Sequence, residues 1–74
     1  MPHPTDILIA NAIRCRRREL GLTLKEVGDR LDVSYQQVQK YESCQNRIAA
    51  STLADIAIIL DINIEYFYKM QYPV

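Results

Sequence analysis

The stretch Leu22–Glu42 reads LTLKEVGDRLDVSYQQVQKYE and contains the two strongest structural signals in the chain. Thr23 and Glu26 form the capping-box pattern T-x-x-E, in which a hydroxyl and a carboxylate satisfy free amides at the start of a helix. Ser34 and Gln37 repeat this pattern as S-x-x-Q. Two capped helices separated by only a few residues predict a tight helix-turn-helix rather than a hairpin of long helices.

Apolar residues at helical spacing predict a further helix on the N-terminal side of this stretch. It begins at Asp6 and ends at Gly21, a residue that is free to take a positive φ. Its apolar face is expected to hold Ile9, Ala12, Ile13 and Leu20. Residues 1–5, which include two prolines, are predicted to form a flexible arm.

The C-terminal third predicts two more helices. One runs from about Ala50 to Leu60, and the other from Ile64 to about Met70 with Asn63 as its N-cap. The sequence thus predicts an all-α fold in a single domain over residues 6–70, followed by a tail over residues 71–74. Only two glycines are present in the whole chain, which disfavours a turn-rich β fold.

Length and composition exclude several classes of protein. A chain of 74 residues, 49% apolar and 24% charged, is long enough for one small globular domain but not for a two-lobed enzyme. We expect no cofactor, no metal site, no membrane span and no signal peptide, and therefore a cytoplasmic protein. His3 is the only histidine, and no catalytic or phosphate-loop pattern is present. Cys15 and Cys44 are expected to be reduced thiols, with a disulfide as the alternative.

The charge of the chain is zero, but it is divided unevenly. Residues 1–47 carry eight basic and six acidic side chains, whereas residues 48–74 carry one basic and three acidic side chains. This distribution predicts a slightly basic half joined to an acidic, apolar half, with modest non-specific attraction to polyanions.

The second capped helix carries glutamine and lysine at positions expected to face solvent. Glutamine can bond an adenine edge in two places and lysine binds the N7 and O6 acceptors of guanine in the major groove. The positions of this helix expected to face solvent are Tyr35, Gln36, Gln37, Gln39 and Lys40.

The span from Ile13 to Tyr68 resembles the helix-turn-helix domain of Cro/C1-type (XRE-family) repressors. The matching motifs are RRELGLT from Arg17, EVGDRLDVS from Glu26, QVQKYE from Gln37, TLADIA from Thr52 and IEYFY from Ile64. The resemblance implies a compact five-helix, lambda-repressor-like domain with the helix-turn-helix at helices 2 and 3. It also implies a sequence-specific regulator, expected to be a repressor, that binds a two-fold double-stranded DNA operator as a homodimer. Residues 34–43 would then be the recognition helix in the major groove.

The same resemblance assigns roles to individual residues. An ion pair between Arg17 and Glu42 would join helices 1 and 3, the alternative being that both side chains face solvent. The expected base contacts are Ser34, Tyr35, Gln36, Gln37 and Lys40, and the expected phosphate contacts are Thr23, Lys25, Ser43, Gln45, Asn46 and Arg47. The alternative for these positions is an ordinary solvated helix face. Among the residues Arg14, Arg16, Arg17 and Arg18, at most Arg14 and Arg18 would point in a common direction.

The sequence departs from the family pattern at four places. The usual glutamine after the threonine cap is Leu24, the usual glycine of the turn is Asp32, and the glycine after the recognition helix is Cys44. The usual serine or proline at the start of helix 4 is replaced by Ile48-Ala49. These differences concern phosphate contacts and loop geometry rather than the fold.

The C-terminal third carries more apolar residues than a core of this size needs. A surplus patch beside a DNA-binding domain predicts a dimer interface, expected to contain Ile58, Ile62, Ile64, Tyr66, Tyr68, Met70 and Tyr72. The alternatives are a tail that folds back on its own core, and a chain that is the first part of a longer repressor. A protein-binding module, such as an antitoxin paired with a toxin or an adaptor, is the competing function.

Overall fold

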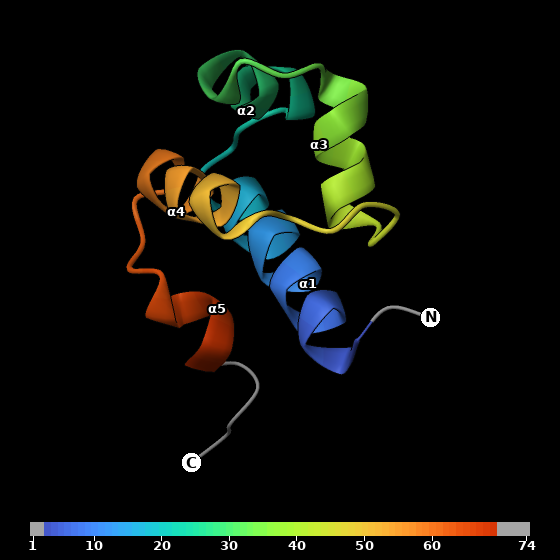
Figure 1. The fold of residues 1–74 in the computed structure, drawn as a ribbon. Coiled ribbons are helices and arrows are strands. Elements are labelled where there is room, and N and C mark those ends of the chain that lie inside the picture. The colour runs from blue at the N-terminus through green and yellow to red at the C-terminus, as the bar shows by residue number, and fades with distance from the viewer. Residues whose placement is uncertain (1–2, 70–74) are drawn as a thin grey trace.

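The computed structural model describes residues 3–69, which form five helices and, within that range, no strand. The helices are α1 (Pro4–Glu19), α2 (Leu24–Leu31), α3 (Tyr35–Glu42), α4 (Ala50–Ile59) and α5 (Glu65–Lys69). As Figure 1 shows, α2 and α3 lie at one end of the molecule and α5 lies at the other, with α1 and α4 between them. The predicted all-α fold with the helix-turn-helix at α2 and α3 is confirmed.

A single apolar core joins the first helix to the last. Ile13, Ile56, Leu60 and Phe67 are almost completely shielded from solvent within this cluster, together with Ile9, Ala12, Leu53 and Ala57. Phe67 therefore anchors α5 against α1, although the two helices stand at opposite ends of the described chain. The prediction that Leu20 shares this face is wrong, because Leu20 forms the C-cap of α1 and its side chain is exposed.

The first helix starts two residues earlier than the sequence indicated. His3 is the N-cap, and its ring Nδ1 accepts a hydrogen bond from the Thr5 amide at 3.0 Å. The Asp6 carboxylate accepts a longer one from the His3 amide, at 3.3 Å, and Pro4 occupies a first-turn position that needs no amide donor. Pro4 and Thr5, which the sequence assigned to an N-terminal arm, thus lie in α1, and a histidine ring takes the place of the usual hydroxyl cap.

The turn between α2 and α3 depends on close approach of the two helices. A Cβ atom at Gly28 would lie 2.7 Å from the carbonyl oxygen of Val33, so only glycine fits without movement of the backbone. Asp32 ends α2 with φ at 62°, the left-handed conformation in which the resembling family has glycine. The sequence has aspartate here in place of the usual glycine, and aspartate is one of the residues that enter the left-handed region at low cost.

The two predicted capping boxes form to different extents. At α2, Thr23 accepts from the Glu26 amide and Glu26 accepts from the Thr23 amide, both at 3.0 Å. At α3, Ser34 accepts from the Gln37 amide at 3.2 Å, but among the described residues the Gln37 side chain is recorded only with Asn46. The prediction of a complete second box is therefore wrong in its glutamine half.

The end of α4 is held from α1. Arg16 donates from Nε to the carbonyl oxygen of Leu60 at 3.0 Å and from Nη2 to that of Asp61 at 3.5 Å. These carbonyls belong to a helix C-terminus, where a cation is favoured. The last helix begins at Glu65, one residue later than predicted, and the Asn63 side chain accepts a hydrogen bond from the Glu65 amide at 3.0 Å.

None of the five helices described over residues 3–69 combines the length and the apolar character that a membrane-spanning helix needs.

Candidate nucleic-acid interface

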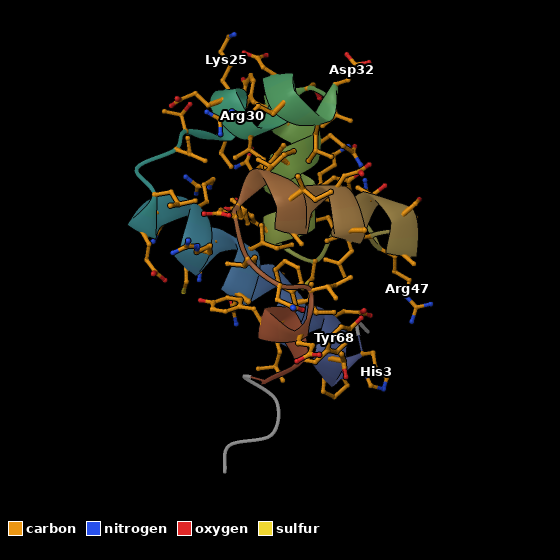
Figure 2. The ribbon with its side chains drawn as sticks, turned by 90° about the vertical axis from the view of Figure 1, so that its left-hand side faces the viewer. His3, Lys25, Arg30, Asp32, Arg47 and Tyr68 are labelled. Carbon is orange, nitrogen blue, oxygen red and sulfur yellow. The ribbon has the colours of Figure 1, made fainter. Side chains whose placement is uncertain are left out.

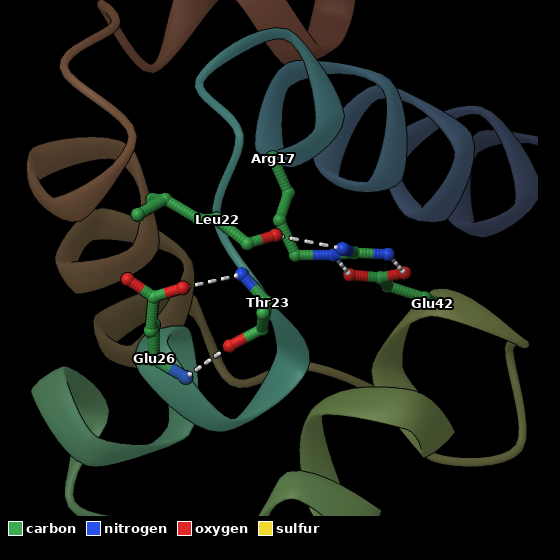
Figure 3. A network of polar contacts seen from close by, with 5 residues as sticks. All are labelled: Arg17, Leu22, Thr23, Glu26 and Glu42. Atoms are coloured by element: carbon green, nitrogen blue, oxygen red, sulfur yellow. Dashed lines mark hydrogen bonds and ion pairs between the residues drawn. The ribbon is translucent and has the colours of Figure 1, made fainter.

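An ion pair fixes the orientation of α3 relative to α1. Arg17 donates from Nε and Nη2 to the two carboxylate oxygens of Glu42, at 2.6 and 3.0 Å, and from Nη1 to the Leu22 carbonyl at 2.9 Å (Figure 3). The side chains are 12% and 6% exposed. The hydrogen bonds to Glu42 raise the pKa of Arg17, against the opposing effect of burial. The ion pair predicted between helices 1 and 3 is present. Its bidentate geometry constrains the relative direction of the two side chains as well as their distance.

The outward face of α3 carries most of the predicted base contacts. Tyr35 is 49% exposed, Gln36 and Lys40 are also exposed, and Gln37 is half-buried. The inward face holds Val38, which is buried. The helix is therefore fixed on one side and open on the other, as a helix that enters a groove must be.

Ser34 stands at the exposed N-terminus of the same helix. Its Oγ accepts from the Gln37 amide, so the hydroxyl proton is still available to an acceptor such as a phosphate or a base edge. The structure thus brings Ser34, Tyr35, Gln36, Gln37 and Lys40 together on one helix and its cap.

Thr23 and Lys25, at the start of α2, are both exposed but already have partners. The Thr23 hydroxyl is engaged in the capping box, and Lys25 lies 3.0 Å from Asp29 one turn further along α2. Figure 2 shows the Lys25 side chain projecting away from the body of the protein. Exposed pairs of this kind contribute little to stability, so Lys25 can exchange Asp29 for a phosphate at small cost.

The segment 43–49 between α3 and α4 carries the other predicted phosphate contacts. Ser43, Gln45, Asn46 and Arg47 are all exposed there. Arg47 is 83% exposed and extends away from the molecule near the start of α1 (Figure 2), where its Nε lies 3.5 Å from the Asp6 carboxylate. A cleft of about 280 Å³ separates this segment from the beginning of α1.

Two of the four clustered arginines serve the fold instead of a polyanion. Arg16 binds the end of α4 and Arg17 binds Glu42, so neither guanidinium is available to a phosphate. Arg14 and Arg18 are exposed, so these two remain the candidates for a common contact.

Sequence reasoning missed several contacts around the segment 43–49. Cys44 has φ at 63°, and its thiol donates to the Asp6 carbonyl at 3.4 Å. Burial raises the pKa of this thiol, and the negative charge of Asp6 raises it further. The family's usual glycine at this position was the signal for the backbone conformation, but nothing in the sequence indicated Asp6 as a partner. Cys15 and Cys44 are both free thiols.

The second exposed feature is apolar and lies on α4, on the segment that leads into α5, and on α5 itself. Ile58 is 77% exposed, and Ile64 and Tyr68 are exposed as well. Ile62 and Tyr66 are half-buried and pack against the core. These two residues therefore follow the alternative to a dimer interface, in which the C-terminal segment folds back on its own domain. Met70 and Tyr72, also predicted for a dimer interface, lie outside the described residues.

A family model described as "Helix-turn-helix" matches residues 13–67, which is most of the chain. The chain belongs to this helix-turn-helix family. The family comprises DNA-binding transcriptional regulators of the Cro/C1 type, as the sequence motifs indicated, and the prediction that the chain is not an enzyme agrees with it.

Two relatives illustrate the extent of the sequence similarity. An HTH-type transcriptional regulator of Sinorhizobium medicae is 40% identical over 68 residues, covering 92% of this chain and 49% of the relative. A transcriptional regulator in the ATPase CF(0) region of Rhodospirillum rubrum is 44% identical over 67 residues, covering 90% and 62%. This helix-turn-helix chain thus spans about half the length of the first curated relatives that it matches.

A solved structure gives an independent comparison of the fold. The P22 c2 repressor, crystallised in complex with a synthetic operator, superposes with a TM-score of 0.73 at 20% identity, covering 80% of this chain and 89% of that chain. The comparison confirms the predicted lambda-repressor-like fold of this helix-turn-helix protein.

Proposed function

We propose that this helix-turn-helix protein is a sequence-specific regulator of transcription, acting as a repressor on a double-stranded DNA operator. The observation that carries the proposal is the outward face of α3, where Tyr35, Gln36 and Lys40 are exposed on a helix fixed by Arg17 and Glu42. Uncommitted amide and ammonium groups on a rigid helix are what recognition of base edges requires.

Phosphate contacts flank this helix on both sides in the proposal. Lys25 lies before it and Arg47 after it, and both project from the body of the protein (Figure 2). Contacts to the DNA phosphates on both sides of α3 would set its register in the major groove. Additional phosphate contacts are proposed for Thr23, Ser43, Gln45 and Asn46. Arg47 has the reach and the planar charge suited to a narrow minor groove.

The exposed apolar residues favour a homodimer. Ile58, Ile64 and Tyr68 are exposed to solvent, and none of them belongs to the proposed base contacts on α3. A second copy bound through this face would place two recognition helices for half-sites about one helical turn apart, or about 34 Å. The protein is proposed to act in the cytoplasm, where the operator is present.

Selection of bound sites from random duplex DNA tests the proposal. We expect an enriched sequence with two-fold symmetry, together with an affinity that falls as salt rises because phosphate contacts release counterions. Alanine substitution of Gln36 should relax the preference at one position per half-site, at a cost of about 1–3 kcal/mol for the favoured base. The matched variant Arg47→Ala should weaken binding to all sequences alike. Absence of any enriched site, with binding insensitive to salt, would contradict the proposal.

A protein partner is the second candidate, and the exposed Ile58 is the observation that favours it. Such a partner, for example a toxin held by an antitoxin, would cover the apolar face and leave α3 without a role in recognition. Substitutions on α3 would then leave the biological activity unchanged, whereas Ile58→Lys would abolish it.

A further inference from the structure

A hydrogen bond joins the recognition helix to the segment that follows it. The Asn46 side chain donates from Nδ2 to the Oε1 atom of Gln37, at 3.4 Å, across nine positions of the chain. Gln37 lies in the first turn of α3, next to the more exposed Gln36, and Asn46 belongs to the exposed segment 43–49. The contact therefore connects a predicted base-reading side chain with a predicted phosphate-binding side chain.

The direction of this bond determines which end of the Gln37 amide is available. An amide side chain has a carbonyl oxygen that accepts and an NH₂ group that donates. With its oxygen turned toward Asn46 and one of the two lone pairs engaged there, Gln37 leads with the NH₂ group. Gln36 differs, because among the residues that the structure describes none is recorded as a hydrogen-bond partner of its side chain.

Base edges in the major groove distinguish these two situations. Bidentate recognition of adenine needs both ends of the amide, since the oxygen accepts from N6 and the NH₂ group donates to N7. An NH₂ group alone is matched by acceptors, which guanine offers at N7 and O6 and thymine offers at O4. The two neighbouring glutamines are thus prepared for different bases although their side chains are chemically identical.

The segment that holds Asn46 is itself well fixed. The backbone N–H of Asn46 donates to the Lys40 carbonyl at 3.4 Å, and the backbone N–H of Gln45 donates to the same oxygen at 3.0 Å. Cys44 holds the turn from the other side through its bond to Asp6. The side-chain amide of Asn46 is therefore held next to Gln37 by a backbone segment that is anchored to α3 and to α1.

We propose that Asn46 is a specificity-determining positioning residue, which orients the Gln37 amide so that it reads an acceptor edge, guanine or thymine, in each half-site. The inference rests on the proposed function, because it assumes that α3 enters the major groove. It adds which side chain sets the base preference of Gln37 from outside the recognition helix.

The variant Asn46→Asp reverses the orientation. A carboxylate only accepts, so it would attract the NH₂ group of Gln37 and turn the carbonyl oxygen outward, toward the donors of adenine N6 or cytosine N4. The variant Gln45→Asp introduces the same charge one position away, with no hydrogen bond to Gln37 in the structure, and is the matched control. Both sites are exposed, and thermal unfolding of each variant verifies that the fold is retained.

Selection from random duplex DNA is carried out with the wild type, both variants and Gln37→Ala. We expect Gln37→Ala to remove the preference at one base pair, and Asn46→Asp to move that preference toward a donor edge. The expected change is about two- to tenfold, the range that the net contribution of one hydrogen bond allows. Gln45→Asp should weaken binding to all sequences and leave the preferred base unchanged.

The outcomes separate the two proposals. If the wild type enriches a site and Asn46→Asp shows the same base preference as Gln45→Asp, the role of Asn46 is overturned and the proposed function stands. A change of preference at several base pairs, rather than at the one lost in Gln37→Ala, also overturns it. If the wild type enriches no sequence, the proposed function fails and the inference fails with it.

Discussion

At the scale of single residues, the Arg17 guanidinium links three parts of the chain. It binds both oxygens of Glu42 at the end of α3 and the carbonyl of Leu22 in the segment before α2. Removing a charge from water is costly, and a buried pair of this kind gives orientation more than net stability. The role of the Arg17–Glu42 pair is therefore to fix the orientation of α3 relative to α1.

Replacing Arg17 by methionine should destabilise the domain by about 3 kcal/mol, because Glu42 would remain buried without its partner. The double variant Arg17→Met/Glu42→Leu should recover much of this loss, since neither charge is then left inside. Chemical denaturation of the wild type, both single variants and the double variant measures the coupling. A double variant less stable than Arg17→Met would contradict this prediction, because it would show that Glu42 stabilises the domain even without its partner.

Glu26 gives the domain a dependence on acid pH. The hydrogen bond from the Thr23 amide lowers the pKa of Glu26 in the folded state. A carboxylate with a lowered folded pKa contributes stability above its unfolded value, about 4.3, and loses that contribution as the pH falls through the folded value. Glu26→Gln keeps the acceptor without the titration, so the wild type should exceed it in stability at pH 7. Urea unfolding at pH 7 and pH 3 checks this, and a gap between the proteins that stays equal at both values would contradict it.

At the scale of elements, the helix-turn-helix is defined by how closely α2 approaches α3. Gly28 is buried against the backbone of Val33 and Ser34, and these atoms cannot move aside as a flexible side chain could. Glycine inside a helix costs about 1 kcal/mol relative to alanine, so the packing must offset a real loss of helix stability. The contact between backbones fixes the position of Ser34, which caps α3.

Gly28→Ala should destabilise the protein by about 1–3 kcal/mol in spite of the better helix propensity of alanine, because overpacking against backbone outweighs it. Arg30→Ala, at an exposed position of α2, is the matched control and should change stability by less than about 0.5 kcal/mol. Thermal unfolding of the two variants compares them directly. A Gly28→Ala protein as stable as the wild type would mean that the α2–α3 turn can open.

Sequence patterns predicted the elements well where the signal was local. The Thr23 capping box and the apolar spacing of α4 depend on residues within one or two turns of each other, so their chemistry is legible in order along the chain. The start of α1 was misplaced because its cap is a histidine ring. The Arg16 contact with α4 could not be predicted, since it joins residues 44 positions apart that only the fold brings together. The Gln37–Asn46 bond spans nine positions, but it depends on the course of the segment after α3, which has no helical pattern.

At the scale of the whole molecule, two different surfaces lie on separate parts of the protein. One is formed by α3 and the segment 43–49 and carries amide and cationic side chains. The other is formed by α4, α5 and the segment between them, and exposes Ile58, Ile64 and Tyr68. The sequence charge has the same division, with an excess of basic side chains before Ile48 and of acidic ones after it. A regulator that binds DNA on one side and a second copy on the other needs both surfaces.

Ile58→Lys should shift the protein from dimer to monomer and reduce its affinity for a two-fold site, because a charge would have to be buried in the proposed interface. Tyr35→Lys, which places the same charge on exposed α3, should remain dimeric and alter only the recognition of DNA. Light scattering at several protein concentrations gives the mass of each species. A wild type that stays at 8.6 kDa at high concentration would contradict the dimer.

The burial of Phe67 against α1 also determines when the protein can acquire its activity during synthesis. Phe67 lies in the same cluster as Ile9 and Ile13, so the core is complete only when both ends of the described chain are present. A ribosome releases α1, α2 and α3 first, while the side chain that covers the base of α1 is still untranslated. On the proposed function, a nascent chain that ends before Phe67 carries the recognition helix without a complete core, so we expect operator binding to begin only after translation has passed Phe67.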